Sequence, residues 1–169
     1  EKKRLDHIFF SPANYSPEKE GDPPVACNEA LKKMVELAIE EIPAYSVMDL
    51  ELQRQALSYT IESIKLLLKE YPLKQFHLIL GEDLLFGLPK WKEVEELLRL
   101  APPLIGTRPG DGVPKLGGSI EKSVNAGKVE IPIVEISSTD LREWLLQKKD
   151  CRDFIPSKVL DYIEQKGLY

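Results

Sequence analysis

The sequence Val-Glu-Ile-Ser-Ser-Thr-Asp-Leu-Arg at residues 134–142 predicts a strand that passes directly into a helix. Residues 131–136 are almost wholly apolar and have the length of a buried strand, which we expect there. Apolar residues then recur at helical spacing, so we expect a helix over 138–147. A buried strand followed at once by a helix is typical of a sheet covered by helices.

Three hydroxyl residues, Ser137, Ser138 and Thr139, fall at the expected start of this helix. The first N–H groups of a helix have no partner within it, and together with the positive end of the helix dipole they can bind a phosphate. Arg142, in the expected first turn, could reach the same anion. Ser137 and Asp140 also have the spacing of a capping box, which needs no ligand. The sequence leaves both interpretations open.

The composition favours one globular domain over residues 1–169. Hydrophobic residues make up 43% of the chain and charged residues 30%, the proportions of a folded soluble protein. The net charge of −5 argues against a nucleic-acid-binding surface, and no apolar run reaches the ~18 residues of a membrane span. Cys27 and Cys151 are too few for a disulfide scaffold or a thiolate metal site. We therefore expect a cytoplasmic protein with no metal site of its own.

Strand-like and helix-like patterns alternate along the chain. We expect strands at 5–10, 45–50, 76–80, 104–107 and 131–136, and helices at 26–41, 58–71, 84–88, 94–100, 138–147 and 156–166. Residues 111–128 are rich in glycine and weakly patterned, so we expect a long loop there. The alternation predicts an α/β fold, a three-layer sandwich around a mostly parallel, Rossmann-like sheet.

Three polar segments each follow an expected strand, at residues 81–83, 108–110 and 137–139. Parallel sheets bind ligands at the carboxyl ends of their strands, so we expect these segments to converge on one edge. Asp83 fits either a hydrogen bond to a ribose hydroxyl or the cap of the following helix. Trp91 fits either stacking on an aromatic ligand or packing beneath a helix.

The two histidines do not suggest catalysis. His77 lies in an apolar run, where a hydrogen-bonded core histidine is the simpler interpretation, and His7 has no evident role. Neither histidine has the spacing of a Ser-His-Asp or Cys-His arrangement. Hydrolysis through a protein nucleophile is therefore not supported.

Four motifs in the chain resemble those of the bacterial nicotinate-nucleotide adenylyltransferases, within the wider nucleotidyltransferase family. Residues 136–142 are similar to that family's Ile-Ser-Ser-Thr-x-Ile-Arg box, and 155–156, 159, 162–163 and 168–169 follow it at familiar spacing. Ser58-Tyr59-Thr60 resembles the family's Ser-Tyr-Thr helix start. Gly81-x-Asp83 with Trp91, and Arg108-Pro109-Gly110, complete the resemblance, which covers nearly the whole chain.

This resemblance implies adenylyl transfer from ATP to nicotinate mononucleotide, with Mg²⁺, giving deamido-NAD and pyrophosphate in NAD biosynthesis. By the same resemblance, ATP would be bound by Gly81, Asp83, Ser137, Ser138, Thr139 and Arg142. The nicotinate nucleotide would be bound by Ser58, Tyr59, Thr60, Trp91 and Arg108. No protein nucleophile is required, because the phosphate of the mononucleotide attacks the α-phosphorus of ATP.

The sequence departs from the family pattern at its beginning. The family opens with a strand and a Gly-Gly-x-Phe-Asp-Pro-x-His-x-Gly-His loop, which this chain does not contain. We therefore expect its first strand–loop–helix unit to be missing and assign no catalytic residue in the chain. Two alternatives stay open: a pantetheine-phosphate adenylyltransferase, whose Ser-Ser-Thr box is similar, and a non-catalytic nucleotide-binding protein. Whether the protein forms a homo-oligomer is also open.

Overall fold

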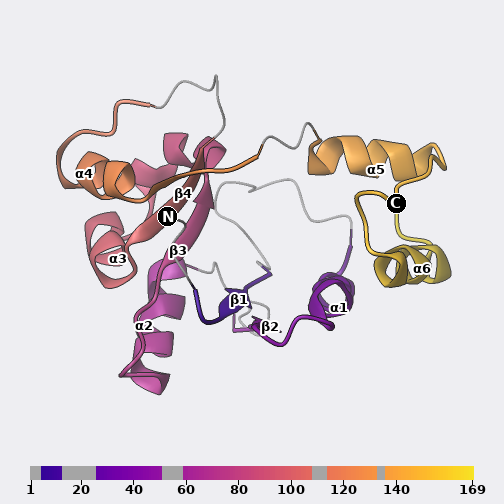
Figure 1. Ribbon diagram of the computed structural model, residues 1–169, viewed down its shortest axis with the longest axis horizontal. Coiled ribbons are helices and arrows are strands. Elements are labelled where there is room, and N and C mark those ends of the chain that lie inside the picture. The colour runs from indigo at the N-terminus through magenta and orange to yellow at the C-terminus, as the bar shows by residue number, and fades with distance from the viewer. Residues whose placement is uncertain (1–4, 13–25, 51–58, 108–113, 133–135) are drawn as a thin grey trace. The chain divides into compact units, whose positions relative to one another are not determined.

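A computed structural model describes residues 5–12, 26–50, 59–107, 114–132 and 136–169. The chain separates into two compact units, of which the first combines both ends of the chain and the second contains the described residues from 59 to 132. Each unit has its own parallel sheet with helices (Figure 1). The predicted α/β class is confirmed, whereas the prediction of a single domain stays a prediction.

The first unit has a two-stranded sheet and three helices among its described residues. In chain order its elements are β1 (Ile8–Phe10), α1 (Asn28–Ile39), β2 (Tyr45–Val47), α5 (Ser138–Leu146) and α6 (Ser157–Lys166). Strands β1 and β2 are parallel, with Ile8 opposite Tyr45. A parallel pair needs a crossover, and α1 supplies it.

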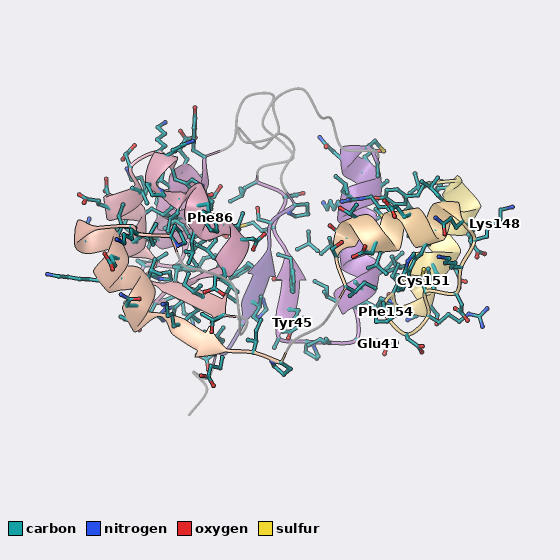
Figure 2. The ribbon with its side chains drawn as sticks, turned by 90° about the horizontal axis from the view of Figure 1, so that it is seen from above. Glu41, Tyr45, Phe86, Lys148, Cys151 and Phe154 are labelled. Carbon is teal, nitrogen blue, oxygen red and sulfur yellow. The ribbon has the colours of Figure 1, made fainter. Side chains whose placement is uncertain are left out.

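Helices α1 and α6 lie side by side in the first unit (Figure 1). Helix α6 buries Val159 and Ile163, which are four residues apart and therefore share one face. An ion pair from Lys158 to Glu40, just after α1, joins the two helices at the surface. Helix α5 has no buried residue. Its Trp144 makes a T-shaped contact with Phe154, and the two ring centroids are 5.7 Å apart. Phe154 lies in the α5–α6 connection (Figure 2).

The second unit has a three-stranded sheet in the order β3-β4-β5, with every pair parallel. Its elements are α2 (Thr60–Glu70), β3 (Leu78–Gly81), the 3₁₀ helices η2 (Glu82–Phe86) and η3 (Leu88–Lys90), α3 (Val94–Leu100), β4 (Pro103–Thr107), α4 (Gly118–Ala126) and β5 (Lys128–Glu130). Its core is one apolar cluster drawn from the sheet and the helices around it. The buried members are Leu80, Leu85, Leu88, Val94, Leu98, Ile105 and Val124.

Gly127 allows β5 to begin beside β4. A Cβ atom at this position would overlap the backbone carbonyl of Pro103, so only glycine fits without displacing the main chain. The carbonyl of Gly127 in turn accepts a hydrogen bond from the N–H of Ile105, at 2.8 Å. The close approach of the two chains thus starts the β4–β5 ladder.

The expected strand at 131–136 is wrong. The strand lies at 128–130, while 131, 132 and 136 are not in a strand and 133–135 are outside the described residues. Pro132 has no N–H group to donate to a ladder, which is a physical reason for the earlier end. The apolar run at 131–136 therefore did not mark the residues that pair in the sheet, which are 128–130.

The expected loop at 111–128 is also wrong in part, because it contains helix α4. Val124 is 1% exposed and, with Ile120 four residues before it, packs against the apolar cluster of the second unit. At the helix start, the carboxylate of Glu121 accepts a hydrogen bond from the N–H of Gly117 at 3.1 Å. Tertiary packing of two apolar residues stabilises a helix that the glycines obscured.

Other elements are confirmed with shifted ends. The helix expected at 26–41 covers 28–39, with Cys27 at its N-cap, and the helix expected at 58–71 covers 60–70. The short helix expected at 84–88 is replaced by η2 and η3. Within the described ranges, no helix has both the length and the apolar character needed to cross a membrane.

Candidate functional site

The predicted site residues are divided between the two units, and each set is described within its own unit. The first unit contains the hydroxyl-rich start of α5, and the second contains the carboxyl end of β3, Trp91 and the start of α2. Ser58 and Arg108 lie outside the described residues. The convergence of these segments on one edge therefore stays a prediction.

Helix α5 begins with a complete capping box. The hydroxyl oxygen of Ser137 accepts a hydrogen bond from the N–H of Asp140 at 3.1 Å, and the N–H of Ser137 donates to the Asp140 carboxylate at 2.8 Å. The Ser137 hydroxyl also donates to that carboxylate, at 2.5 Å. These bonds hold the pKa of Asp140 below its usual range, with the side chain of Ser137 as the largest cause. The capping interpretation is confirmed.

The capping box leaves part of this helix start available for a ligand. The N–H groups of Ser138 and Thr139 belong to the first two helical residues, which have no acceptor within a helix, and both residues are exposed. Arg142 is exposed as well, but it is the fifth residue of α5 rather than a member of the first turn. Phosphate binding by this start stays a prediction, in which Ser138 and Thr139 contribute amides while Ser137 holds the cap.

Gly81 is the last residue of β3, and Asp83 lies two residues later in η2. The carboxylate of Asp83 lies over the Cα of Gly81, in the space that a Cβ atom at residue 81 would take. Asp83 is exposed and belongs to η2, whose N-cap is Gly81 with no side-chain capping bond. The prediction that Asp83 caps the next helix is therefore wrong, and its carboxylate is presented at the end of a parallel strand.

Trp91 lies at the end of η3, ten residues beyond the end of β3. Its backbone N–H donates to the carbonyl of Leu88 at 3.1 Å, and its ring packs against the apolar cluster of the second unit. The residue is half-buried, so part of the indole is fixed by the core and part is accessible. Stacking on a ligand stays a prediction, which this geometry allows.

Tyr59 and Thr60 are the N-cap and the first residue of α2, and both are half-buried. Tyr59 makes no side-chain capping bond. Its ring is instead contacted by the ammonium group of Lys92, which lies 4.5 Å from the ring centroid. The residue that follows Trp91 in the sequence thus contacts the predicted nicotinate-binding start of α2.

Two ion pairs that were not predicted from the sequence connect α2 to Lys92 and Glu93. Lys92 donates to the carboxylate of Glu62 at 2.7 Å, and Lys65 donates to that of Glu93 at 2.6 Å. The hydrogen bond to Glu62 raises the pKa of Lys92, the bond to Glu93 raises that of Lys65, and the bond from Lys65 lowers that of Glu93. The sequence indicated only that Glu62 and Lys65, three residues apart, lie on one face of the helix. It did not indicate which residues pair with them.

Both histidines are hydrogen-bonded within the protein, and both cysteines are free. His77 donates from Nδ1 to the carbonyl of Pro102 at 3.0 Å, and His7 is hydrogen-bonded through Nε2 to the hydroxyl of Ser46 at 2.7 Å. Cys27 and Cys151 are free thiols. In the part of the chain that the structure describes, no three His, Cys, Asp or Glu side chains are grouped as a metal site.

Comparisons with known proteins give strong matches, although no family model matches the chain. A protein of Oceanobacillus iheyensis named "Probable nicotinate-nucleotide adenylyltransferase" is 35% identical over 167 residues, which cover 99% of this chain and 83% of that protein. A protein of Bacillus mycoides with the same name is 37% identical over 165 residues, covering 98% and 83%.

Among solved structures, nicotinic acid mononucleotide adenylyltransferase of Plasmodium falciparum complexed with NaAD matches with a TM-score of 0.73 and 22% identity, over 98% of this chain and 83% of that one. The same enzyme complexed with APC gives a TM-score of 0.72. At this identity the match shows a shared fold.

Proposed function

The chain belongs to the nicotinate-nucleotide adenylyltransferase family, and we propose that it transfers the adenylyl group of ATP to nicotinate mononucleotide. The products are deamido-NAD, a dinucleotide of NAD biosynthesis, and pyrophosphate. The observation that carries the proposal is the match of 35–37% identity over nearly the whole chain to proteins with this name. The motifs around Gly81, Trp91 and Ser137 lie within the matched region and agree with it.

The ATP ligands of this proposal are assigned within each unit separately. The α5 start binds phosphates through the amides of Ser138 and Thr139 and the guanidinium of Arg142, while Ser137 holds the cap. Asp83, held against Gly81, accepts hydrogen bonds from the ribose hydroxyls. The phosphate ligands of the α5 start balance the charge that develops on the leaving pyrophosphate.

The described residues assigned to the nicotinate nucleotide, Tyr59, Thr60 and Trp91, belong to the second unit. The accessible part of Trp91 stacks on the pyridine ring, and Tyr59 and Thr60 at the start of α2 contribute further contacts. Ser58 and Arg108 are assigned to the same nucleotide from the family resemblance. A phosphate oxygen of the mononucleotide attacks the α-phosphorus, and the bond from that phosphorus to the pyrophosphate breaks.

We assign no residue of this chain to Mg²⁺. Among the described residues, no three His, Cys, Asp or Glu side chains are grouped as a metal site. Mg²⁺ would be supplied with the triphosphate and would offset the negative charge of its phosphates. The cytoplasm, where ATP and the mononucleotide occur, is the proposed location. Self-association stays open.

Calorimetric titrations show whether nicotinate mononucleotide or pantetheine phosphate is the acceptor of the adenylyl group. The protein is titrated with a nonhydrolysable ATP analogue, with nicotinate mononucleotide and with pantetheine phosphate. Binding of the analogue and of the mononucleotide supports the proposal. Binding of pantetheine phosphate in place of the mononucleotide would replace it with the second adenylyltransferase, and binding of the ATP analogue alone would favour a nucleotide-binding protein.

A further inference from the structure

Two ion pairs of opposite polarity join helix α2 to the two residues that directly follow Trp91. Glu62 on the helix is paired with Lys92, and Lys65, one turn later, is paired with Glu93. The two α2 residues share a face, whereas their partners are consecutive in the sequence. We call Glu62, Lys65, Lys92 and Glu93 the α2 clasp.

Lys92 makes two contacts with one ammonium group. Its Nζ atom is 2.7 Å from the Glu62 carboxylate and 4.5 Å from the centre of the Tyr59 ring. The carboxylate fixes the position of the cation, and the cation attracts the face of the ring. Tyr59, next to the first residue of α2, is thereby held toward the segment that contains Trp91.

Glu93 carries backbone strain that the clasp helps to maintain. Its φ angle is +50°, in the left-handed region that residues other than glycine avoid. The residue lies between η3 and α3, so this angle sets the direction in which the chain leaves Trp91. Lys65 fixes the Glu93 side chain at 2.6 Å and also reaches Glu96 at 3.4 Å.

Stability alone does not account for this arrangement. The Lys92 and Glu62 side chains are 42% and 39% exposed, and exposed ion pairs contribute little to folding. The buried residues on either side, Leu88 and Val94, already anchor the segment in the apolar cluster. The half-buried Trp91 lies between these two anchors.

We infer that the α2 clasp is a positioning device for the nicotinate subsite, in which Lys92 sets the Tyr59 ring and the Trp91 indole in their binding geometry. The inference rests on the proposed function, because it assigns the ligand of these rings. The residues of the clasp act through Tyr59 and Trp91 rather than on the reacting atoms. A preset pair of rings binds with a smaller loss of conformational freedom.

The first test needs no ligand. In a Trp144→Phe background, Trp91 is the single tryptophan, and its quenching by acrylamide reports the accessibility of the indole. Lys92→Met keeps the apolar stem but removes the charge, so quenching of Trp91 rises; Lys92→Arg keeps the charge and the original quenching. Lys90→Ala, which removes a lysine on the other side of Trp91, is the matched control. Unchanged quenching in Lys92→Met would overturn the inference.

The second test measures ligand affinities of the same variants by calorimetry. Lys92→Met raises the Kd for nicotinate mononucleotide about three- to tenfold, and the Kd for a nonhydrolysable ATP analogue stays unchanged. Lys92→Arg restores the mononucleotide affinity. Equal loss of both ligands would indicate a general structural effect and would also overturn the inference.

The outcomes separate the clasp from the proposed function. If quenching changes in Lys92→Met but the unaltered protein does not bind nicotinate mononucleotide, the assignment of the ligand fails and the proposed function fails with it. If the unaltered protein binds the mononucleotide and Lys92→Met binds it equally well, the proposed function stands and the clasp has no part in it.

Discussion

The carboxylate of Asp83 occupies the space in which a side chain at Gly81 would begin. The two residues therefore form one structural feature at the carboxyl end of β3: the glycine makes room, and the aspartate is presented there because of it. The spacing Gly-x-Asp follows from this geometry.

Gly81→Ala weakens ATP binding because the new methyl group forces the Asp83 carboxylate to rotate away. We expect a loss of about tenfold, similar to that of Asp83→Ala and to the loss of a hydrogen bond to a charged group. The double variant should lose little more than either single variant, because both changes remove the same interaction. Calorimetry with an ATP analogue measures all three, and additive losses would show that Gly81 acts independently of Asp83.

Trp91→Leu weakens binding of nicotinate mononucleotide with little effect on ATP. Leucine retains apolar contact with the cluster beneath the indole but has no aromatic face, so the protein stays folded while stacking is lost. We expect a Kd increase of about three- to tenfold, with Trp91→Phe closer to the original value. Equal losses for the mononucleotide and for ATP would count against stacking.

Arg142→Ala weakens ATP binding by about tenfold or more, because a guanidinium that is hydrogen-bonded to phosphate is lost. The ATP affinity of Arg142→Lys should fall between those of the unaltered protein and Arg142→Ala, since lysine keeps the charge without the planar guanidinium. Arg152→Ala removes an exposed arginine elsewhere in the same unit and serves as the control. Unchanged ATP affinity in Arg142→Ala would remove the phosphate site from this helix.

The capping box makes the stability of the α5 start depend on pH. The folded-state pKa of Asp140 is lowered, so its contribution is present above the ordinary pKa of an aspartate and is lost as pH falls through the depressed value. Asp140→Asn should therefore unfold more readily than the unaltered protein at neutral pH. In acid, the free energies of unfolding of the two proteins should become equal. Urea unfolding across this range measures the difference, and a gap that persists at the lowest pH would rule out the carboxylate as its source.

Local patterns predicted the elements whose own residues specify them. Helix α2 could be predicted because Ile61, Ile64 and Leu67 recur at helical spacing and are all buried. Helix α4 was missed because its one buried residue, Val124, becomes apolar core only when it meets a cluster built by other elements. The position of β5 depends on the contact of Gly127 with Pro103, which is far away in the sequence.

In the candidate site, too, local features could be predicted from the sequence and contacts between distant residues could not. The capping box of Ser137 and Asp140 is a local feature and could be predicted from the spacing alone. The pairing of Lys92 with Glu62 joins residues 30 positions apart, and exposed charges carry no signal that selects a partner at such a separation. The same holds for the contact of Lys92 with Tyr59, which only the fold brings together.

The most direct measurement is the transfer itself. The protein is incubated with Mg²⁺, nicotinate mononucleotide and ATP labelled at the α-phosphorus, and the products are separated by chromatography. The proposal predicts that the label appears in deamido-NAD, in equal amount to the pyrophosphate released and only when the mononucleotide is present. Binding of both nucleotides without any labelled dinucleotide would contradict it and would leave a nucleotide-binding protein in its place.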